Sequence, residues 1–336
     1  MKYDKVFMTS SPSFYKNRLF SEISKHITIC VIFTGAAYHQ RNADFYKGEQ
    51  RFDHITLPKG LLNQIKVMDA FLKQNDFDEI VFGGWDNKIT WYTMFRTPKA
   101  KNACIFESSI NESSVTGKKG LVKKVFLSRL HKAYPSGVLQ ADLLNGLGFS
   151  GEIVRYGGCG ILNYQQQPEF EKRDEVKNFI FVGRLVPVKN LELLISVFNK
   201  LPQYTLTIVG FGPLESKLKA MANNNIIFTG AIDNANLPQY YRSADVFVLA
   251  SYSETWGLVV EEALNNGTPV IVSDRVGCHK DLVSSETGLV FKSGDENSLM
   301  AAVSRISDVG FYNHLREGVS KLDFQARAER QIQSFL

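Results

Sequence analysis

Two charged residues in the second half of the chain have the types and the spacing to bind a diphosphate. Arg184 and Lys189 lie five residues apart, directly after Gly183, between a predicted strand and a predicted helix. A glycine turn at this place leaves backbone N–H groups free, and two cations beside them suit phosphate oxygens. An isolated pattern of this kind is also common in ordinary solvated turns that join a strand to a helix.

Two carboxylates form the second chemical feature. Glu254 precedes a predicted helix, and Glu262 lies about one turn inside it. The start of that helix offers unpaired N–H groups and the positive end of the helix dipole, which favour a phosphate. Because carboxylates repel phosphate oxygens, we expect these two to accept hydrogen bonds from sugar and ribose hydroxyls. The sequence shows no nearby metal-ligand cluster, so we expect neither a metal nor a cofactor.

The elements that must position these residues follow an α/β pattern, in which short apolar strands alternate with helical stretches. We predict two Rossmann-like, doubly wound domains at residues 1–165 and 178–322, joined by a polar linker at 166–177. A final helix at 323–336 is expected to cross back to the first domain. Open α/β sheets bind ligands outside the carboxyl ends of their strands, so a central cleft is expected there.

The individual elements are predicted from the periodicity of apolar residues. In the first half, the expected strands are 5–9, 27–33, 79–82, 102–106, 137–139 and 152–155, and the expected helices are 15–25, 59–75, 118–132 and 139–147. In the second half, the expected strands are 178–182, 204–209, 226–229, 246–250, 269–273 and 288–291, with helices at 191–199 and 258–266.

Composition limits the class of protein. The 336 residues are 44% hydrophobic and 22% charged, and the mean hydropathy is −0.14. No stretch approaches the roughly 18 apolar residues of a membrane-spanning helix, which favours a soluble, cytoplasmic chain. The four cysteines include no Cys-x-x-Cys pair, which argues against a zinc knuckle, a redox motif and a disulfide framework.

The positive charge is concentrated in the first half. Residues 1–170 contain 22 Lys and Arg against 15 Asp and Glu, whereas the remainder contains 17 against 19. No acidic residue occurs between residues 113 and 141, where an amphipathic helix is predicted. The basic residues there are Lys118, Lys119, Lys123, Lys124, Arg129 and Lys132. They predict contact with an anionic membrane surface, although a solvated helix face is the alternative. No nucleic-acid motif accompanies them.

Aromatic and acidic residues follow the predicted strand at 79–82. Trp85 and Asp86 come directly after Gly83 and Gly84, at the carboxyl end of that strand. An aromatic face and a carboxylate suit sugar stacking and hydroxyl binding, so both are candidate acceptor-binding residues. Burial of Trp85 in the core is an equally good interpretation.

Seven ordered motifs resemble retaining glycosyltransferases of the GT-B fold, the glycosyltransferase group 1 (family 4) type. They occupy residues 182–189, 208–213, 228–230, 244–251, 254–263, 267–271 and 287–290. This resemblance implies metal-independent transfer of a sugar, with retained anomeric configuration, from a UDP- or GDP-linked donor. It also implies a glycan or polyprenyl-diphosphate-linked acceptor, in the synthesis of O-antigen, capsule or lipooligosaccharide. Contact through the basic residues would place the protein at the inner face of the cytoplasmic membrane. A catalytically silent homologue that binds a nucleotide sugar or scaffolds a synthesis complex is the alternative.

The same resemblance assigns roles to residues. Arg184 and Lys189 would neutralise the donor diphosphate, Glu254 would hold donor-sugar hydroxyls, and Glu262 would hold the ribose. The remaining donor-binding residues implied are Gly183, Gly210, Gly212, Thr255, Trp256, Gly257 and Leu258.

The first half departs from the family pattern at two places. Ser11 stands in the first loop, where relatives often have a glycine pair, and Glu107 follows the strand at 102–106, where many have a histidine. Ser11 is therefore a candidate acceptor contact. Glu107 is a candidate catalytic residue near the acceptor or donor sugar, with helix capping by its Ser and Asn neighbours as the alternative.

Overall fold

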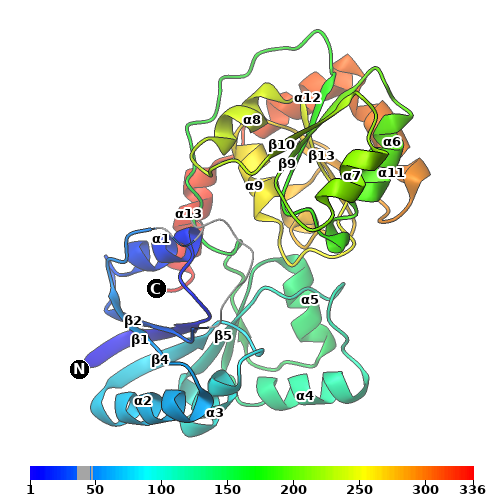
Figure 1. The fold of residues 1–336 in the computed structure, drawn as a ribbon. Helices are drawn as coiled ribbons and strands as arrows, with labels where there is room; N and C mark the ends of the chain where they lie inside the picture. Colours follow the sequence, from blue (N-terminus) through cyan, green and yellow to red (C-terminus); the bar gives the residue numbers. More distant parts are fainter. Residues whose placement is uncertain (36–45, 47) are drawn as a thin grey trace. The chain divides into compact units, whose positions relative to one another are not determined.

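The computed structural model describes residues 1–35, 46 and 48–336. The described chain divides into two compact units (Figure 1). The first contains Met1–Asn163 and Gln325–Leu336, and the second contains Tyr164–Phe324. Each unit is built on a parallel sheet with crossover helices, which is the α/β architecture that the alternating sequence pattern predicts.

In the first unit, seven parallel strands lie in the order β3-β2-β1-β4-β5-β6-β7. The strands are β1 (Lys2–Thr9), β2 (Ile29–Phe33), β3 (Asp53–Thr56), β4 (Asp76–Phe82), β5 (Asn102–Phe106), β6 (Lys132–Pro135) and β7 (Glu152–Ile153). The helices are α1 (Phe14–Ile23), α2 (Leu61–Gln74), α3 (Lys88–Arg96), α4 (Gly117–Leu127), α5 (Val138–Gly146) and the short 3₁₀ helix η2 (Lys99–Lys101).

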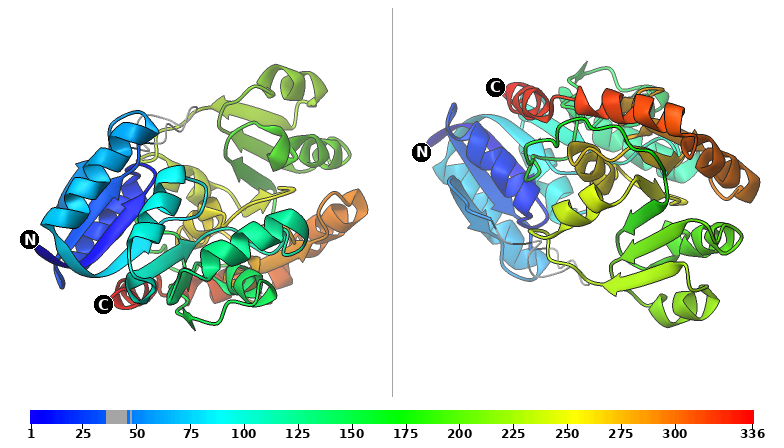
Figure 2. Two further views of the ribbon diagram at one scale, coloured as in Figure 1. Left: turned by 90° about the horizontal axis from the view of Figure 1, so that it is seen from below. Right: turned by 90° about the horizontal axis from the view of Figure 1, so that it is seen from above.

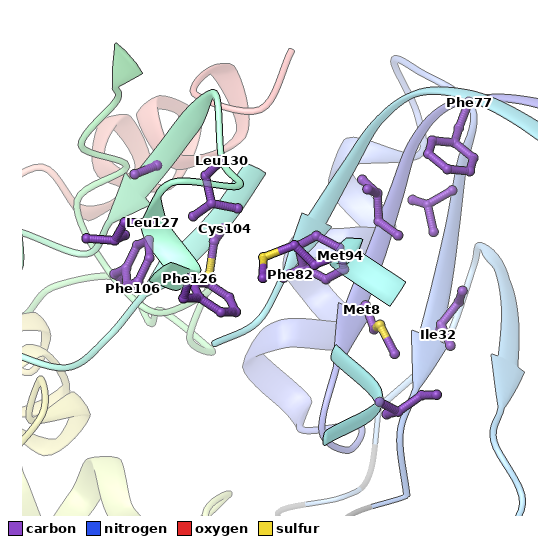
Figure 3. Packing of buried hydrophobic residues seen from close by; sticks show 14 of the residues in the cluster. Met8, Ile32, Phe77, Phe82, Met94, Cys104, Phe106, Phe126, Leu127 and Leu130 are labelled. Atoms are coloured by element: carbon purple, nitrogen blue, oxygen red, sulfur yellow. The ribbon is translucent and has the colours of Figure 1, made fainter. Parts of the chain in front are cut away.

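The central strands of this sheet are apolar on both faces. Every residue of β2 and β5 is buried, as expected where helices cover both sides of a parallel sheet. Figure 3 shows part of the resulting core, in which Phe82 of β4, Cys104 of β5 and Phe126 of α4 belong to one hydrophobic cluster. This core holds rigid the strand ends from which the functional loops depart.

The strand predicted at 137–139 is wrong. The structure places β6 at Lys132–Pro135, where Ala133 and Tyr134 pair with Cys104 and Ile105 of β5. Gly137 is the N-cap of α5, and the apolar run after it is helical. A short apolar run fits a buried strand and a buried helix equally well, which explains the error. The helix predicted at 118–132 accordingly ends at Leu127.

Two elements of the first unit escape the sequence pattern. Strand β3 is a mostly exposed edge strand, so it has no apolar face to reveal it. Helix α3 is rich in aromatic and β-branched residues, which favour strands in isolation. Its start is fixed by Asn87, whose side chain accepts a hydrogen bond of 3.1 Å from the Ile89 amide.

In the second unit, six parallel strands lie in the order β10-β9-β8-β11-β12-β13. The strands are β8 (Asn178–Val182), β9 (Thr205–Val209), β10 (Ile226–Gly230), β11 (Val246–Leu249), β12 (Val270–Ser273) and β13 (Gly288–Phe291). The helices are the 3₁₀ helix η3 (Pro187–Lys189), α6 (Leu191–Asn199), α7 (Glu215–Met221), α8 (Leu237–Ser243), α9 (Leu258–Asn265), α10 (His279–Leu282), α11 (Glu296–Ile306) and α12 (Val309–Ser320). Helix α6 packs against α7 and α11, and α8 packs against α9.

The segment predicted as a linker has irregular backbone and is bound along the second unit. Just before it, the Gln165 amide donates to Asn265 Oδ1 at 2.9 Å, and within it the Arg173 amide donates to Asn313 Oδ1 at 2.8 Å. The final helix α13 (Phe324–Gln333) leads the chain back into the first unit, beside which it is drawn in red (Figure 2). There Phe335 packs on Phe7 at a ring separation of 5.7 Å.

Candidate functional site

The order of strands in the second sheet brings the two charged loops of this unit together. Chain order reverses between β8 and β11, which are hydrogen-bonded neighbours. Ligands of open α/β sheets bind at the carboxyl ends of such a pair. The loop that follows β8 carries Lys189, and the loop that follows β11 carries Glu254. A hydrogen bond of 2.8 Å from the Tyr252 amide to the Val188 carbonyl holds the two loops side by side.

The lysine and the first glutamate of the candidate site form an ion pair. Lys189 Nζ contacts Glu254 Oε2, and the two side chains are only 12% and 19% exposed. Arg184 is exposed and, among the described residues, has no ion-pair partner. The side chains that the sequence assigns to phosphate and to sugar are thus already in contact. Arg184 therefore adds to this edge a positive charge that no described acidic side chain neutralises.

Glycines hold the neighbouring loop against the turn that carries Arg184. A Cβ atom on Gly212 would lie 2.5 to 2.8 Å from backbone atoms of Leu185, and one on Gly210 would overlap the Gly183 carbonyl oxygen. The Leu185 amide donates to the Phe211 carbonyl at 2.9 Å. Residues with side chains could not approach so closely. Gly210 and Gly212 thus shape the site by packing backbone against backbone.

The loop that carries Glu254 is fixed by a second backbone contact. The Glu254 amide donates to the Arg275 carbonyl at 3.2 Å, and the Gly277 amide donates back to the Glu254 carbonyl at 2.8 Å. Gly257 then takes a positive φ of 101° as the N-cap of α9. Helix α9 begins at Leu258, so its first amides have no acceptor within the helix. They supply the N–H groups that the sequence predicts for a phosphate.

Trp256 contributes only its backbone to this edge. Its side chain is 1% exposed, and its indole Nε1 donates to Glu261 Oε2 at 3.1 Å. Glu261 is fully buried and also accepts a hydrogen bond of 2.6 Å from the Tyr164 hydroxyl. Two donors therefore satisfy this carboxylate, which anchors the loop from inside. Sequence reasoning missed Glu261, since one of two consecutive glutamates gives no sign of which is buried.

Glu262 lies on the next position of α9 and has an unusual pKa. Burial raises the pKa of its carboxyl to about 7, although the hydrogen bond from Tyr241 lowers it and the nearby charge of Glu261 raises it. The Tyr241 hydroxyl donates to Glu262 Oε2 at 2.8 Å. Sequence reasoning missed Tyr241, because nothing in a lone tyrosine 21 residues away indicates this contact. One carboxylate oxygen is used, and the other is available for a ligand.

The equivalent edge of the first unit contains a polar cavity of about 420 Å³. It lies beyond the carboxyl ends of the neighbouring strands β1 and β4, where chain order also reverses. Asp86 and Asn87 line it, and Asn87 Nδ2 donates to Thr34 Oγ1 at 2.8 Å. Asp86 is exposed and, within the described part of the chain, makes no hydrogen bond or ion pair. Its carboxylate is open to a ligand hydroxyl.

Trp85 does not line this cavity, and neither does Ser11. The Trp85 ring packs edge to face on Phe106 and Phe126, at 5.2 and 6.1 Å, and Lys123 Nζ lies 5.3 Å from its centre. This packing favours the core interpretation of Trp85 over an open face for sugar stacking.

Glu107 forms an ion pair that the sequence does not indicate. Its Oε1 lies 3.0 Å from Lys16 Nζ of helix α1, in a largely buried position. Burial, the largest single cause, lowers the pKa of Lys16, but the charges of Glu107, Tyr15 and Cys159 and the hydrogen bond to Glu107 together raise it above the usual range of lysine. Glu107 therefore has a fixed position at the carboxyl end of β5.

The six basic residues of the predicted membrane patch divide into two groups. Three are bound within the unit: Lys123 donates to Ser113 Oγ and the Ser114 carbonyl, Arg129 donates to the Thr97 carbonyl, and Lys132 pairs with Glu152. The other three, Lys118, Lys119 and Lys124 of α4, are exposed. On the same helix Leu121, Val122 and Val125 are 65%, 55% and 46% exposed. The predicted apolar stripe of this helix is thus partly open to solvent.

Across residues 1–35, 46 and 48–336, no group of three or more His, Cys, Asp or Glu side chains is placed to hold a metal ion. The same residues include no helix with the length and apolar character needed to span a bilayer.

Comparison with known proteins shows that the second unit is similar to one protein family. Residues 164–317 match the sequence model of the Glycosyl transferases group 1 family. The chain is 35% identical over 186 residues to the sulfoquinovosyl transferase SQD2 of Arabidopsis thaliana, which covers 49% of this chain and 36% of that protein. It is 36% identical over 133 residues to the O-antigen biosynthesis glycosyltransferase WbnH of Escherichia coli, covering 39% and 38%. The chain thus matches little more than a third of each relative.

A solved structure extends the likeness to the whole fold. Sucrose-phosphate synthase from Thermosynechococcus elongatus superposes with a TM-score of 0.76 over 98% of each chain, at 20% identity. Residues 164–317 of the second unit are thus similar to the group 1 glycosyltransferase family, and the chain has the GT-B fold.

Proposed function

We propose that the protein is a retaining, metal-independent glycosyltransferase that uses a UDP- or GDP-linked sugar. Its acceptor is a glycan or a polyprenyl-diphosphate-linked glycan, in the synthesis of a bacterial surface polysaccharide such as O-antigen, capsule or lipooligosaccharide. The observation that carries the proposal is the convergence of Arg184, Lys189, Glu254 and the start of α9 at the carboxyl ends of β8 and β11. The O-antigen role of the relative WbnH supports the choice of pathway.

The charges of this edge suit departure of a nucleoside diphosphate. In the reaction the bond from the sugar C1 to the diphosphate oxygen breaks, a bond from C1 to the acceptor oxygen forms, and the acceptor releases a proton. Negative charge grows on the leaving diphosphate. Arg184, Lys189 and the free amides of α9 stabilise that charge more strongly in the transition state than in the ground state, which lowers the barrier.

Binding of the donor must also release the ion pair. Lys189 exchanges Glu254 for a phosphate oxygen, and Glu254 then accepts hydrogen bonds from the donor sugar. Glu262 accepts from the ribose with the oxygen that Tyr241 leaves free. The pair thus keeps two buried charges compensated until the donor arrives.

We assign the acceptor sugar to the polar cavity of the first unit. Neutral hydrogen-bonding groups from Thr34, Gln64, Asn87 and Thr90 line it beside one carboxylate, Asp86, and one ammonium group, Lys88. Such a lining suits the hydroxyls of an uncharged sugar. Glu107 and Ser11 stay in the proposal as a catalytic and an acceptor contact of the same unit.

We also assign membrane contact to α4, which would place the protein at the inner face of the cytoplasmic membrane. Lys118, Lys119 and Lys124 stand beside the exposed apolar residues Leu121, Val122 and Val125. Each basic residue near an anionic leaflet contributes on the order of 1 kcal/mol. In vesicle sedimentation, alanine at the three lysines should weaken binding to anionic vesicles by about 100-fold. Equal binding to zwitterionic vesicles would contradict this assignment.

Thermal shift with nucleotides tests the donor site directly. A ligand that binds only the folded state raises the melting temperature. We expect a shift with either the UDP or the GDP series, without added metal, and its loss in Arg184→Ala. Absence of any shift would contradict the proposal. Turnover with the matching sugar nucleotide then separates an enzyme from a silent homologue, which would bind the donor without consuming it.

A further inference from the structure

A second cavity in the second unit lies at the sheet edge opposite to Lys189 and Glu254. It has a volume of about 200 Å³. Ala244, just before β11, and Thr268, just before β12, both line it. Because β11 and β12 run parallel, these residues mark the amino ends of the strands, whereas the donor loops follow the carboxyl ends. The cavity is therefore separate from the candidate donor site.

Three arginines from three different segments line this cavity. Arg173 comes from the irregular chain before β8, Arg242 from α8 and Arg316 from α12. Arg242 is held in place, since its Nε donates to Asn266 Oδ1 at 3.0 Å and its Nη2 donates to the Gln166 carbonyl at 2.9 Å. Each guanidinium carries five N–H donors, so this fixed group still has donors to spare.

The other two arginines are less fully compensated. Arg173 Nη1 lies 3.8 Å from Asp245 Oδ1, which is beyond hydrogen-bond length. That carboxylate instead accepts from the backbone amides of Lys177 and Asn178 through its other oxygen. Within the described chain, Arg316 has no ion-pair partner. Planar guanidinium groups that share one small cavity suit an oxyanion, which they can bind in bidentate fashion.

Two carboxylates in the same lining limit the affinity. Glu169 and Glu171 are both exposed, and neither makes an ion pair with a described residue. The lining charge is thus three cations against two anions. Both glutamates lie on the exposed chain before β8, where they can turn toward solvent while Arg242 stays fixed. The volume is below the roughly 300 Å³ at which drug-sized sites begin, so the ligand must be small.

We propose that this cavity is a binding site for a small phosphate-bearing molecule of the size of pyrophosphate. The site is independent of the proposed glycosyltransferase activity, because it uses none of the donor residues. The guanidinium groups of Arg173 and Arg316 close on the phosphate oxygens, and Arg242 forms the fixed wall of the site.

Isothermal titration of the full chain with pyrophosphate and with inorganic phosphate tests the site. The double variant Arg173→Gln, Arg316→Gln preserves both hydrogen bonds of Arg242, and it should weaken pyrophosphate binding at least about tenfold. Glu169→Gln with Glu171→Gln should act in the opposite direction and tighten binding several-fold, because repulsion is removed. Unchanged affinity in both double variants would overturn the proposal.

The donor site also attracts phosphates, so Lys189→Ala serves as the control. Pyrophosphate binding at the arginine cavity should persist in Lys189→Ala. If this variant no longer binds pyrophosphate at all, the proposal is overturned. If circular dichroism shows that the arginine double variant is unfolded, the glutamine variants at the exposed Glu169 and Glu171 decide the question by the sign of their effect.

Discussion

The two units share a strand order and a charged pair, but among the described residues only the second has the excess positive charge that we expect of a diphosphate site. In each sheet the order begins 3-2-1-4-5-6 in chain numbering. Each unit also places a largely buried Lys–Glu pair at the carboxyl edge of its sheet, Lys16 with Glu107 and Lys189 with Glu254. Because both units have this strand order and this kind of ion pair, these two features do not distinguish the proposed donor site.

The difference lies in what surrounds each pair. In the second unit the exposed Arg184 and the free amides at the start of α9 add positive potential that no described acidic partner cancels. In the first unit the polar cavity beside β1 and β4 is lined by one anion, Asp86, one cation, Lys88, and neutral groups. The comparison predicts that excess positive charge and open N–H groups favour a diphosphate, whereas balanced charge favours sugar hydroxyls.

The largest effect should come from removing the lysine of the second pair. Lys189→Ala removes a cation from the leaving diphosphate, so kcat/KM should fall by about 100- to 1000-fold. Lys16→Ala, the matched change in the first unit, should reduce it by about tenfold, since it touches no phosphate and only leaves Glu107 without its partner. Steady-state kinetics with the nucleotide sugar found by thermal shift measures both changes. Equal losses of kcat/KM in the two variants would contradict the proposal that only the lysine of the second unit binds the diphosphate.

Lys189 also pairs with Glu254, so a control must separate the loss of this ion pair from the loss of the phosphate contact. If Lys189 matters only as the partner of Glu254, its removal should cost nothing in a Glu254→Gln background. We expect the loss to persist there, because phosphate is the partner that counts in the transition state.

The second largest effect concerns the backbone packing that distinguishes the donor edge. Gly212→Ala places a methyl group against the Leu185 backbone, and it should destabilise the second unit by about 1–3 kcal/mol. Gly310→Ala, in the exposed first turn of α12, meets only Asp308 Oδ1 at 3.4 Å and should be neutral or stabilising. Urea unfolding of both variants gives the two free energies. A neutral Gly212→Ala would show that the close approach is unnecessary.

The sequence reveals more of the second unit than of the first, because the two candidate sites are built from different kinds of residue. Strands β8 and β13 have the predicted bounds, as does α6. The loops after β8 and β11, which carry predicted donor residues, lie side by side. Where two backbone segments lie in direct contact, glycine is required at particular positions, and these glycines are visible in the sequence as a motif. The polar cavity of the first unit is made of ordinary Thr, Gln and Asn side chains, which leave none. Helix α3 was hidden because packing overrode the local preference of its aromatic residues.

A moderate effect should separate the acceptor edge from the donor edge. Asp86→Asn removes one charge-assisted hydrogen bond to a sugar hydroxyl, so the acceptor KM should rise about tenfold while the donor KM is unchanged. Asp78→Asn, in the same strand β4 but near its amino end and exposed, is the matched control. Kinetics with acceptor varied at saturating donor measures the effect. A change in the donor KM alone would show that Asp86 contacts the donor, which contradicts its proposed role in acceptor binding.

The smallest effect concerns pH and the second unit alone. The pKa of Glu262 is raised to about 7, so the carboxylate forms as the pH rises through neutrality. Ribose hydroxyls donate to the ionised form, and donor affinity should therefore increase over this range. Tyr241→Phe removes a hydrogen bond that stabilises the carboxylate and lowers its pKa. The pH midpoint of donor binding should therefore move upward in Tyr241→Phe. Donor affinity should be several-fold weaker than in the wild type near pH 7 and nearly equal to it about two pH units higher.

Titration with an intact nucleotide sugar isolates this ionisation, because its esterified phosphates do not titrate near neutrality. Tyr240→Phe, one residue earlier in α8, leaves the bond to Glu262 intact and should keep the wild-type midpoint. Glu261, the other carboxylate near Glu262, is held by Tyr164 and Trp256 in both variants. A midpoint that stays in place in Tyr241→Phe would show that Tyr241 does not tune Glu262. Burial and the nearby charge of Glu261 would then account for the raised pKa of Glu262, and the pH dependence of donor binding would not depend on Tyr241.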